Sequence, residues 1–250
     1  MKFLRAAVPV LSCLLAFSLP AFSQSAAPEA GVAMAVGTAR QQYTRSFAGL
    51  PQLFNGPEYV DYAKNYRERT GFQFFMWPEK QLGSVDYNGY TFPDVRLAYD
   101  AVLDQVVMSP PNSPLALRLI DERVRAFTLA DHRFVRLVAD SASRNVISTG
   151  YYEVLLDSTV QVVAKRAKHL QEHIVQQYVA VEFVTTDKLL LKKAGRYYPV
   201  SSKSSVLHLL ADRNKEMQKY LQEHKLKFNK TQREPSIVQL AAYYSSLPPR

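Results

Sequence analysis

The sequence predicts an α+β fold in which an antiparallel β-meander, a curved or half-barrel-like sheet, is followed by C-terminal helices. Two observations support this class. From residue 50 to 200, short runs of alternating apolar and polar residues are separated by turn-forming residues, and a period of two is typical of strands with one buried face. From residue 201 to 250 the apolar spacing becomes helical, so we expect this region to pack on the sheet as a covering layer.

The start of the chain has the pattern of a secretory signal peptide, which we assign to residues 1–23. Lys2 and Arg5 precede an apolar run over 6–17, and Ala21-Phe22-Ser23 has the small-x-small form of a cleavage site. A membrane anchor is the alternative, but a span needs about 20 apolar residues. We therefore expect an exported protein, periplasmic or associated with the outer membrane, without a transmembrane span in the mature chain.

Cys13, the single cysteine, lies inside this apolar run. Lipid attachment at Cys13 is an alternative to simple cleavage, although the apolar run before it is very short. If Cys13 is removed with the signal peptide, disulfides, cysteine-ligated zinc and a cysteine nucleophile are all excluded. Residues 24–49 are rich in Ala, Gly, Gln and Ser, and they are predicted to form a flexible lead-in.

The strongest hairpin signal is Asn88-Gly89 between two aromatic runs, because Asn-Gly tolerates the two positive φ angles of a type I′ turn. A weaker copy at Asn55-Gly56 is followed by Pro57, which cannot donate to a strand ladder. In the strand that follows Asn88-Gly89, Tyr99 is expected on the buried face of the sheet and Asp100 on the solvent-exposed face.

The aromatic residues around this hairpin are candidates for a binding face. Exposed rings on a sheet can stack on sugars or line an apolar groove. The alternative is that the rings form cross-strand pairs that hold the sheet together. The candidates are Tyr87, Tyr90, Phe92 and Tyr99.

The later strands and the helices follow from local turn and cap signals. The stretch "GYYEVLLDSTVQVVAKR" predicts a hairpin that turns at Asp157-Ser158. The stretch "VAVEFVTTDKLLLKKAGRYYPV" predicts further strands with turns at Thr186-Asp187 and Ala194-Gly195. In the helical region, Ser202 or Ser204 is expected to cap a short helix, Asp212 to cap the next one, and Pro235 to lie near the start of the last.

The formal net charge of +9 raises the question of an anionic partner. For an exported chain we expect a lipid or an anionic glycan rather than nucleic acid. A solvated basic surface is the alternative, since scattered lysines near turns are common on exposed edges. Lys165, Arg166 and Lys168 are the basic binding candidates, because they lie on neighbouring predicted hairpins with other basic residues.

One motif offers a different function. "HLQEH", from His169 to His173, fits the pattern H-x-x-E-H. On a helix over 166–178 the two imidazoles would share a face, and Glu172 could act as a base on a zinc-bound water. The alternative function is therefore a zinc-dependent hydrolase. Against it, no spacing selects a third ligand, and the adjacent basic residues disfavour a cation.

Other catalytic patterns are weaker still. Neither G-x-S-x-G nor a phosphate-binding glycine loop is present. Paired acids such as Asp100 with Asp104, or Asp121 with Glu122, could serve a glycosidase, but acids that flank turns usually only form the turns.

Several stretches together resemble an uncharacterised group of exported, β-rich proteins from Bacteroidota. They are "LFNGPEYVDY", "GFQFF", "GSVDYNGYTFPDVRLAYD", "GYYEVLLD", "DRNKEMQKYLQEHKLKFNK" and "LAAYYSSL". The resemblance covers most of the mature chain and implies export and fold, but no reaction. We therefore expect a non-enzymatic binding or scaffolding module of the cell envelope, without a cofactor, whose partner is an envelope protein, a lipid or an anionic glycan.

Overall fold

The computed structural model describes residues 34–39, 41, 51–111, 113–141, 143 and 145–248. The predicted signal peptide lies outside the described residues, as does the predicted lead-in apart from residues 34–39 and 41, which are helical. Contacts divide the chain into two units, Met1–Ala39 and Arg40–Arg250. The sheets and the helices α2 to α4 belong to the second unit.

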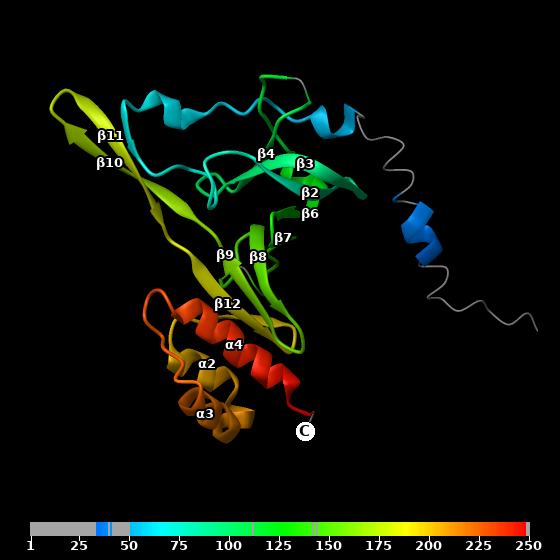
Figure 1. The fold of residues 1–250 in the computed structure, drawn as a ribbon, viewed down its shortest axis with the longest axis vertical. Helices are drawn as coiled ribbons and strands as arrows, with labels where there is room; N and C mark the ends of the chain where they lie inside the picture. The colour runs from blue at the N-terminus through cyan, green and yellow to red at the C-terminus, as the bar shows by residue number, and fades with distance from the viewer. Residues whose placement is uncertain are drawn as a thin grey trace, which may run out of the picture. The chain divides into compact units, whose positions relative to one another are not determined.

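A curled, ten-stranded antiparallel sheet with C-terminal helices forms this unit, which confirms the predicted fold class (Figure 1). The strand order is β13-β12-β9-β8-β7-β6-β2-β3-β4-β5. The strands are β2 (Gln81–Tyr87), β3 (Tyr90–Asp100), β4 (Gln105–Met108), β5 (Leu117–Arg118), β6 (Val124–Leu129), β7 (His132–Leu137), β8 (Gly150–Asp157), β9 (Gln161–Lys165), β12 (Lys188–Lys193) and β13 (Arg196–Pro199). The order departs from a simple meander because β6 pairs with β2 and β12 pairs with β9.

The strands β10 (Lys168–Val175) and β11 (Tyr178–Thr185) leave the main sheet as a hairpin, termed the arm. A short strand, β1 (Glu68–Thr70), pairs with β11 in parallel on its other side. In Figure 1 the arm projects away from the ten-stranded sheet. We expected a continuous meander with a turn at Thr186-Asp187, whereas this segment returns the chain from the arm to the main sheet.

The two Asn-Gly sequences behave differently. Asn88 and Gly89 have φ angles of 53° and 83°, and Tyr87 pairs with Tyr90 across them, which confirms the predicted hairpin. Asn55-Gly56 forms no hairpin. It follows the 3-10 helix η1 (Pro51–Phe54) and precedes an isolated bridge between Glu58 and Leu117.

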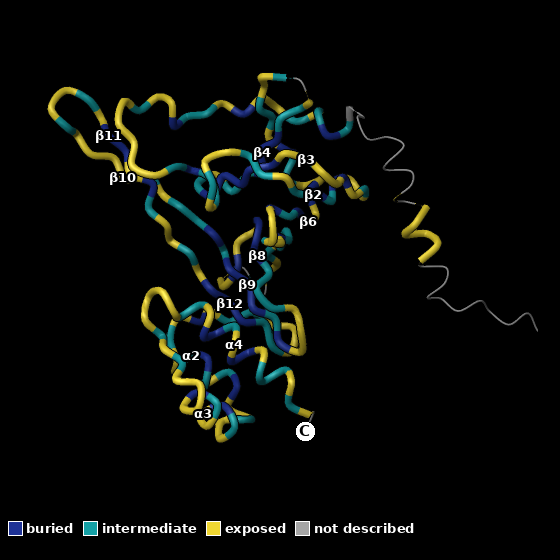
Figure 2. The backbone as a smooth tube through the Cα atoms, in the orientation of Figure 1, coloured by how far each residue is buried: buried dark blue, intermediate teal, exposed yellow. Residues whose placement is uncertain are grey.

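The first part of the core lies inside the curl of the sheet, where Figure 2 shows buried backbone segments of the strands. Tyrosine and phenylalanine rings contribute much of this cluster. Phe127 on β6 and Phe134 on β7 are cross-strand partners. Their rings stack with a centroid distance of 4.7 Å and an interplanar angle of 6°. Tyr99 and Tyr151 pack around this pair at centroid distances of 5.1 to 5.7 Å. Burial of these large apolar surfaces is the main force that closes the curl.

The second part of the core lies between the helices and one face of β8, β9 and β12. The helices are α2 (Lys203–Leu209), α3 (Asn214–Glu223) and α4 (Arg233–Ser246). Met217, Leu221 and Leu240 are buried against strand residues such as Val162. No helix in the described part of the chain is long and apolar enough to cross a membrane.

The helix starts agree only partly with the predicted caps. Ser202 caps α2 through a capping box with Ser205, and Pro235 lies in the first turn of α4 as expected. Asp212 does not cap α3. It lies in the 3-10 helix η4 (Ala211–Arg213), and its carboxylate accepts hydrogen bonds from Lys193 and Tyr244 instead.

Candidate functional site

The structure places the predicted aromatic face inside the core. Tyr87 and Tyr99 have no exposed surface, Phe92 is 6% exposed, and the half-buried Tyr90 packs against the same cluster. The hydroxyl of Tyr87 donates to Asn55 Oδ1 at 2.8 Å. These rings hold the sheet together, as in the cross-strand alternative, and they do not form the exposed face that we expected.

Asp100 was expected on a wet face, but it has no exposed surface. The segment before β2 covers this side of the sheet. Tyr59 and Tyr62 donate to the carboxylate of Asp100 at 2.7 and 3.2 Å, and two backbone N–H groups also donate to it. Burial raises the pKa of the Asp100 carboxyl, and these hydrogen bonds oppose the rise. Asp100 therefore anchors the covering segment on the end of β3.

The predicted basic patch is largely paired within the chain. Lys165 Nζ lies 2.5 Å from Asp104 Oδ2. Lys168 Nζ donates to the carbonyl oxygens of Phe72 and Phe74 at 2.8 and 2.6 Å. Arg166 is 8% exposed and contacts several carboxylates. The three candidates are thus engaged in internal contacts, unlike the exposed anion-binding surface that we expected.

Arg166 is the centre of a buried ionic cluster. Its Nε donates to Glu153 Oε2 at 2.5 Å, and one terminal nitrogen donates to Asp187 Oδ2 at 2.7 Å. Both terminal nitrogens donate to the two oxygens of Glu234, at 2.8 and 2.7 Å. Glu153 also contacts His132 Nδ1. Burial opposes the charge on Arg166, but the hydrogen bonds that it donates to its carboxylate partners, together with their negative charges, raise its pKa above the ordinary value.

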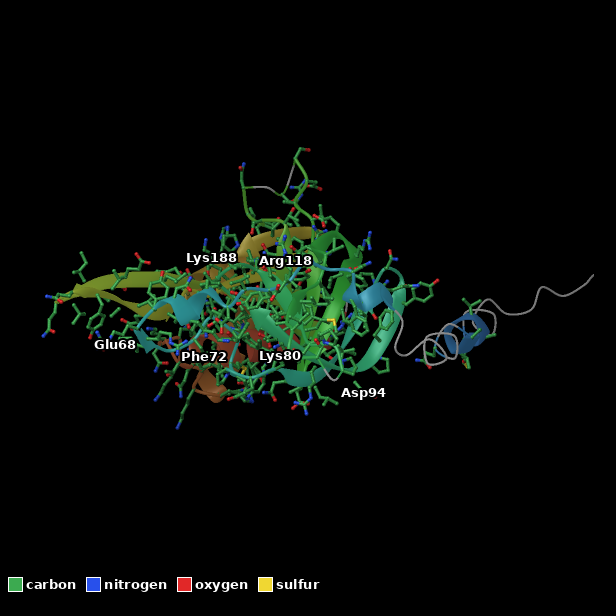
Figure 3. The ribbon with its side chains drawn as sticks, turned by 90° about the horizontal axis from the view of Figure 1, so that it is seen from above. Glu68, Phe72, Lys80, Asp94, Arg118 and Lys188 are labelled. Atoms are coloured by element: carbon green, nitrogen blue, oxygen red, sulfur yellow. The ribbon has the colours of Figure 1, made fainter. Side chains whose placement is uncertain are left out.

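This cluster lies at the junction, the place where the arm leaves β9 and returns to β12 (residues 166–167 and 186–187). The Thr186 N–H donates to Ala167 O at 2.8 Å, and the Ala167 N–H donates to Asp187 Oδ1 at 3.2 Å. Two pockets, of about 460 and 560 Å³, share Ala167 and Asp187 in their linings. Figure 3 labels Phe72, which lines the first pocket, and Lys188, which lines the second.

The smaller pocket, termed the aromatic pocket, is lined partly by Phe72, Phe75, His132 and Lys168. The rings of Phe75 and His132 meet edge to face at 5.2 Å. The ammonium of Lys168 lies 4.2 Å from the centroid of Phe72. Burial lowers the pKa of Lys168, and the charge of Asp187 opposes this effect. The polar groups of this pocket fasten the loop around Phe72 to the junction.

The "HLQEH" motif lies on a strand. His169, Glu172 and His173 belong to β10, so the helix over 166–178 that the zinc hypothesis requires does not form. Successive side chains on a strand alternate between faces, which separates Glu172 from the two histidines. Glu172 accepts a hydrogen bond from Tyr66 instead. Within the described ranges, no three His, Cys, Asp or Glu side chains are grouped so that they could hold a metal ion.

The open edge of the arm is the feature that the sequence analysis missed. In the three-stranded sheet β10 pairs with β11 alone, while β11 lies between β10 and β1. Ile174 near the tip is 85% exposed. Leu170 and Ile174 are four residues apart, a spacing that also fits one face of a helix, so the sequence does not reveal that this segment is a strand at an edge.

Comparison with known proteins finds no matching family model, no matching curated protein and no matching solved structure.

Proposed function

We propose that the protein is a non-enzymatic binding module of the cell envelope that recognises an extended segment of another envelope protein. The segment adds as a strand to the outer edge of β10, so that backbone hydrogen bonds supply affinity and neighbouring side chains supply selectivity. The observation that supports this function best is the unprotected edge of the arm.

The register of the arm identifies which backbone groups point outward. β10 and β11 pair from Lys168↔Thr185 to Val175↔Tyr178 around a two-residue turn. In such a hairpin the closing pair exchanges both hydrogen bonds, and so does every second pair after it. The N–H and C=O groups of Leu170, Glu172 and Ile174 therefore point away from β11. Lys168 follows the same alternation, because its N–H donates to Ala101 O at 2.9 Å.

The outer edge lacks the usual devices that prevent strand addition. Natural edge strands are protected by proline, by outward lysines or by bulges. β10 contains no proline, and its pairing with β11 continues without a bulge. Its single lysine, Lys168, is directed to the carbonyl oxygens of Phe72 and Phe74. Figure 2 shows that much of the arm is exposed along its length. This edge is therefore available for an added strand.

Placement in the cell envelope rests on the signal-peptide pattern of residues 1–23 and on the resemblance to exported proteins. The contacts of Lys165, Arg166 and Lys168 support a non-enzymatic role. Each of these cations contacts a carboxylate or a backbone carbonyl of the chain itself, and so none is left exposed to act on a substrate.

A matched pair of variants tests strand addition. Ile174→Pro removes one outward N–H without removing a bond to β11, and Ile174→Thr keeps that N–H with a β-branched side chain. The mature protein would be screened against a displayed library of short peptides, and binding of the enriched peptides would be measured by isothermal titration. We expect Ile174→Thr to retain binding and Ile174→Pro to lose most of it.

Amide NMR shifts would locate the bound peptide. The proposal requires the largest changes at Leu170, Glu172 and Ile174. Equal binding by both variants, or shifts confined to another surface, would reject strand addition. Stable self-association that is abolished by Ile174→Pro would show instead that the edge pairs with a second copy of this chain.

A further inference from the structure

The larger pocket at the junction, termed the Arg233 pocket, has an apolar wall. Ile147, Tyr152 and Leu190 line it and belong to one buried apolar cluster. Tyr152 on β8 and Leu190 on β12 belong to a different cluster from the residues of these strands that pack against the helices, and Ile147 precedes β8. The pocket volume of about 560 Å³ falls within the range of small-molecule sites. This wall can therefore accept the apolar body of a ligand.

The two carboxylates beside the pocket, those of Asp187 and Glu234, accept hydrogen bonds from Arg166. Arg166 binds both oxygens of Glu234 and one oxygen of Asp187. The other oxygen of Asp187 accepts the N–H of Ala167. Both carboxylates are thus engaged by Arg166, and among the described residues no ion pair joins either of them to Arg233 or Lys188.

Two cations in the lining are left without an acidic partner. Arg233 and Lys188 both line the pocket, and neither takes part in the ion pairs found among the described residues. The Nε of Arg233 is shielded from solvent and has no hydrogen-bond acceptor in the described part of the chain. A buried donor without an acceptor is unfavourable. Because Arg233 lines the pocket, an anionic ligand that reached its guanidinium would supply the missing acceptor.

The position of Arg233 adds to the positive potential. Arg233 is the first residue of α4, a helix of 14 residues, and the N-terminal end of a helix carries a partial positive charge. Lys165 also lines the pocket, but Asp104 neutralises it. The pocket thus combines an apolar wall with two cationic side chains, Arg233 and Lys188, that form no ion pair among the described residues.

We propose that the Arg233 pocket binds an amphipathic anion, a molecule with one carboxylate or phosphate group and an apolar body. Arg233 and Lys188 contact the anionic group, and the wall formed by Ile147, Tyr152 and Leu190 contacts the apolar body. This site is separate from the arm edge and does not depend on strand addition there.

Titration of the full mature chain with decanoate, decyl phosphate and uncharged 1-decanol tests the site. We expect the two anions to bind and 1-decanol to bind much more weakly. Arg233→Met removes the charge with little loss of volume, and it should weaken anion binding by about ten- to hundredfold, the usual effect of losing one charge-assisted hydrogen bond. Arg233→Lys should restore part of the affinity.

Two further variants keep the test decisive if Arg233→Met fails to fold. Lys188→Met changes an exposed residue, so it should leave the fold intact and weaken binding severalfold. Lys219→Met removes a cation of α3 that is paired with Glu223, and it should leave binding unchanged. The proposal is wrong if neither anion binds, if 1-decanol binds as tightly as decanoate, or if Arg233→Met and Lys188→Met both bind like the parent chain.

Free and membrane-bound anions can be separated in the same assay. Binding of decyl phosphate together with phosphatidylglycerol vesicles would identify a lipid head group as the source. Binding of the free anions without vesicle binding would identify a soluble ligand. Vesicle binding that persists in both Arg233→Met and Lys188→Met would show only general attraction to a basic surface, and it would count against the pocket.

Discussion

The guanidinium of Arg166 and the carboxylate of Glu234 form a bidentate pair with nitrogen–oxygen distances of 2.8 and 2.7 Å. This pair joins the segment between β9 and β10 to the first turn of α4. Because Arg166 also binds Glu153 on β8, one side chain links the main sheet, the base of the arm and the helical region. The positive charge of Arg166 therefore helps to hold both the helical region and the base of the arm against the main sheet.

Arg166→Met should strongly destabilise the fold. The change leaves Glu153, with a side chain only 4% exposed, without its guanidinium partner. Breaking a buried pair by removing one partner costs about 3–5 kcal/mol. Urea unfolding of the variant and the parent chain would measure this loss. Arg125→Met is the matched control, because Arg125 pairs with Asp86 on the surface and such pairs contribute about 0–1 kcal/mol. Equal losses in the two variants would contradict this role for Arg166.

Phe134→Ala should open the aromatic part of the core. Phe134 has no exposed surface and stacks on Phe127. Loss of its ring leaves a cavity among rigid neighbours, at a cost of about 3–5 kcal/mol. Thermal unfolding would measure the effect. Val138→Ala is the control, because this position is 63% exposed, and it should have little effect on stability. If Phe134→Ala lowered the stability as little as Val138→Ala, the core would have collapsed around the gap.

Gly150→Ala should be more damaging than Gly195→Ala. Both glycines have positive φ angles, 151° and 79°. A Cβ at Gly150 would lie 1.9 Å from Asp104 Oδ2 and 2.6 Å from Lys165 Nζ, whereas a Cβ at Gly195 meets no atom within 4 Å. Gly195→Ala thus tests backbone strain alone, which should lower the free energy of unfolding by about 1 kcal/mol. Gly150→Ala should lower it further, because the new Cβ also disrupts the ion pair between Asp104 and Lys165. Denaturant midpoints would compare them, and equal midpoints would mean that Asp104 and Lys165 move aside freely.

Asp121 should make stability depend on pH in a defined direction. Burial raises the pKa of this carboxyl above its ordinary value of 3.8, and the hydrogen bond from Tyr151 opposes the rise. A raised pKa in the folded state means that protonation favours folding. This contribution is complete below about pH 3.8 and is lost as the pH rises through the folded-state pKa. Most paired carboxylates have a lowered pKa in the folded state and lose their contribution to stability as the pH falls, so Asp121 has the opposite pH dependence.

The variant Asp121→Asn keeps an oxygen acceptor for Tyr151 and removes the titration. The difference in unfolding free energy between Asp121→Asn and the parent chain should therefore move in favour of the variant as the pH rises above 3.8. Urea unfolding at a series of pH values would measure it. A difference that stays constant, or that moves toward the parent chain, would contradict a raised pKa.

The local features of the fold were predictable from the sequence. Alternation of apolar residues predicted most strands, Asn88-Gly89 predicted its turn, and helical spacing predicted the C-terminal helices. These features depend on residues close together in the chain, so a short window contains their physical cause. The same windows placed Arg166 and Lys168 on neighbouring hairpins as candidates for binding an anion, whereas the structure places them in internal contacts at the junction.

The candidate site depends on contacts that no local pattern contains. Arg166 and Glu234 are 68 positions apart, and Tyr59 lies 41 positions from Asp100, which it covers. The departure of β10 and β11 from the main sheet likewise follows from long-range pairing. The sequence by itself determined the fold class, the strongest turn and the helices, because each residue's preference for burial or for a turn is local. Only the tertiary structure decided which charges are neutralised, which aromatic rings are buried and which strand edge remains open, because these depend on which distant segment covers each group.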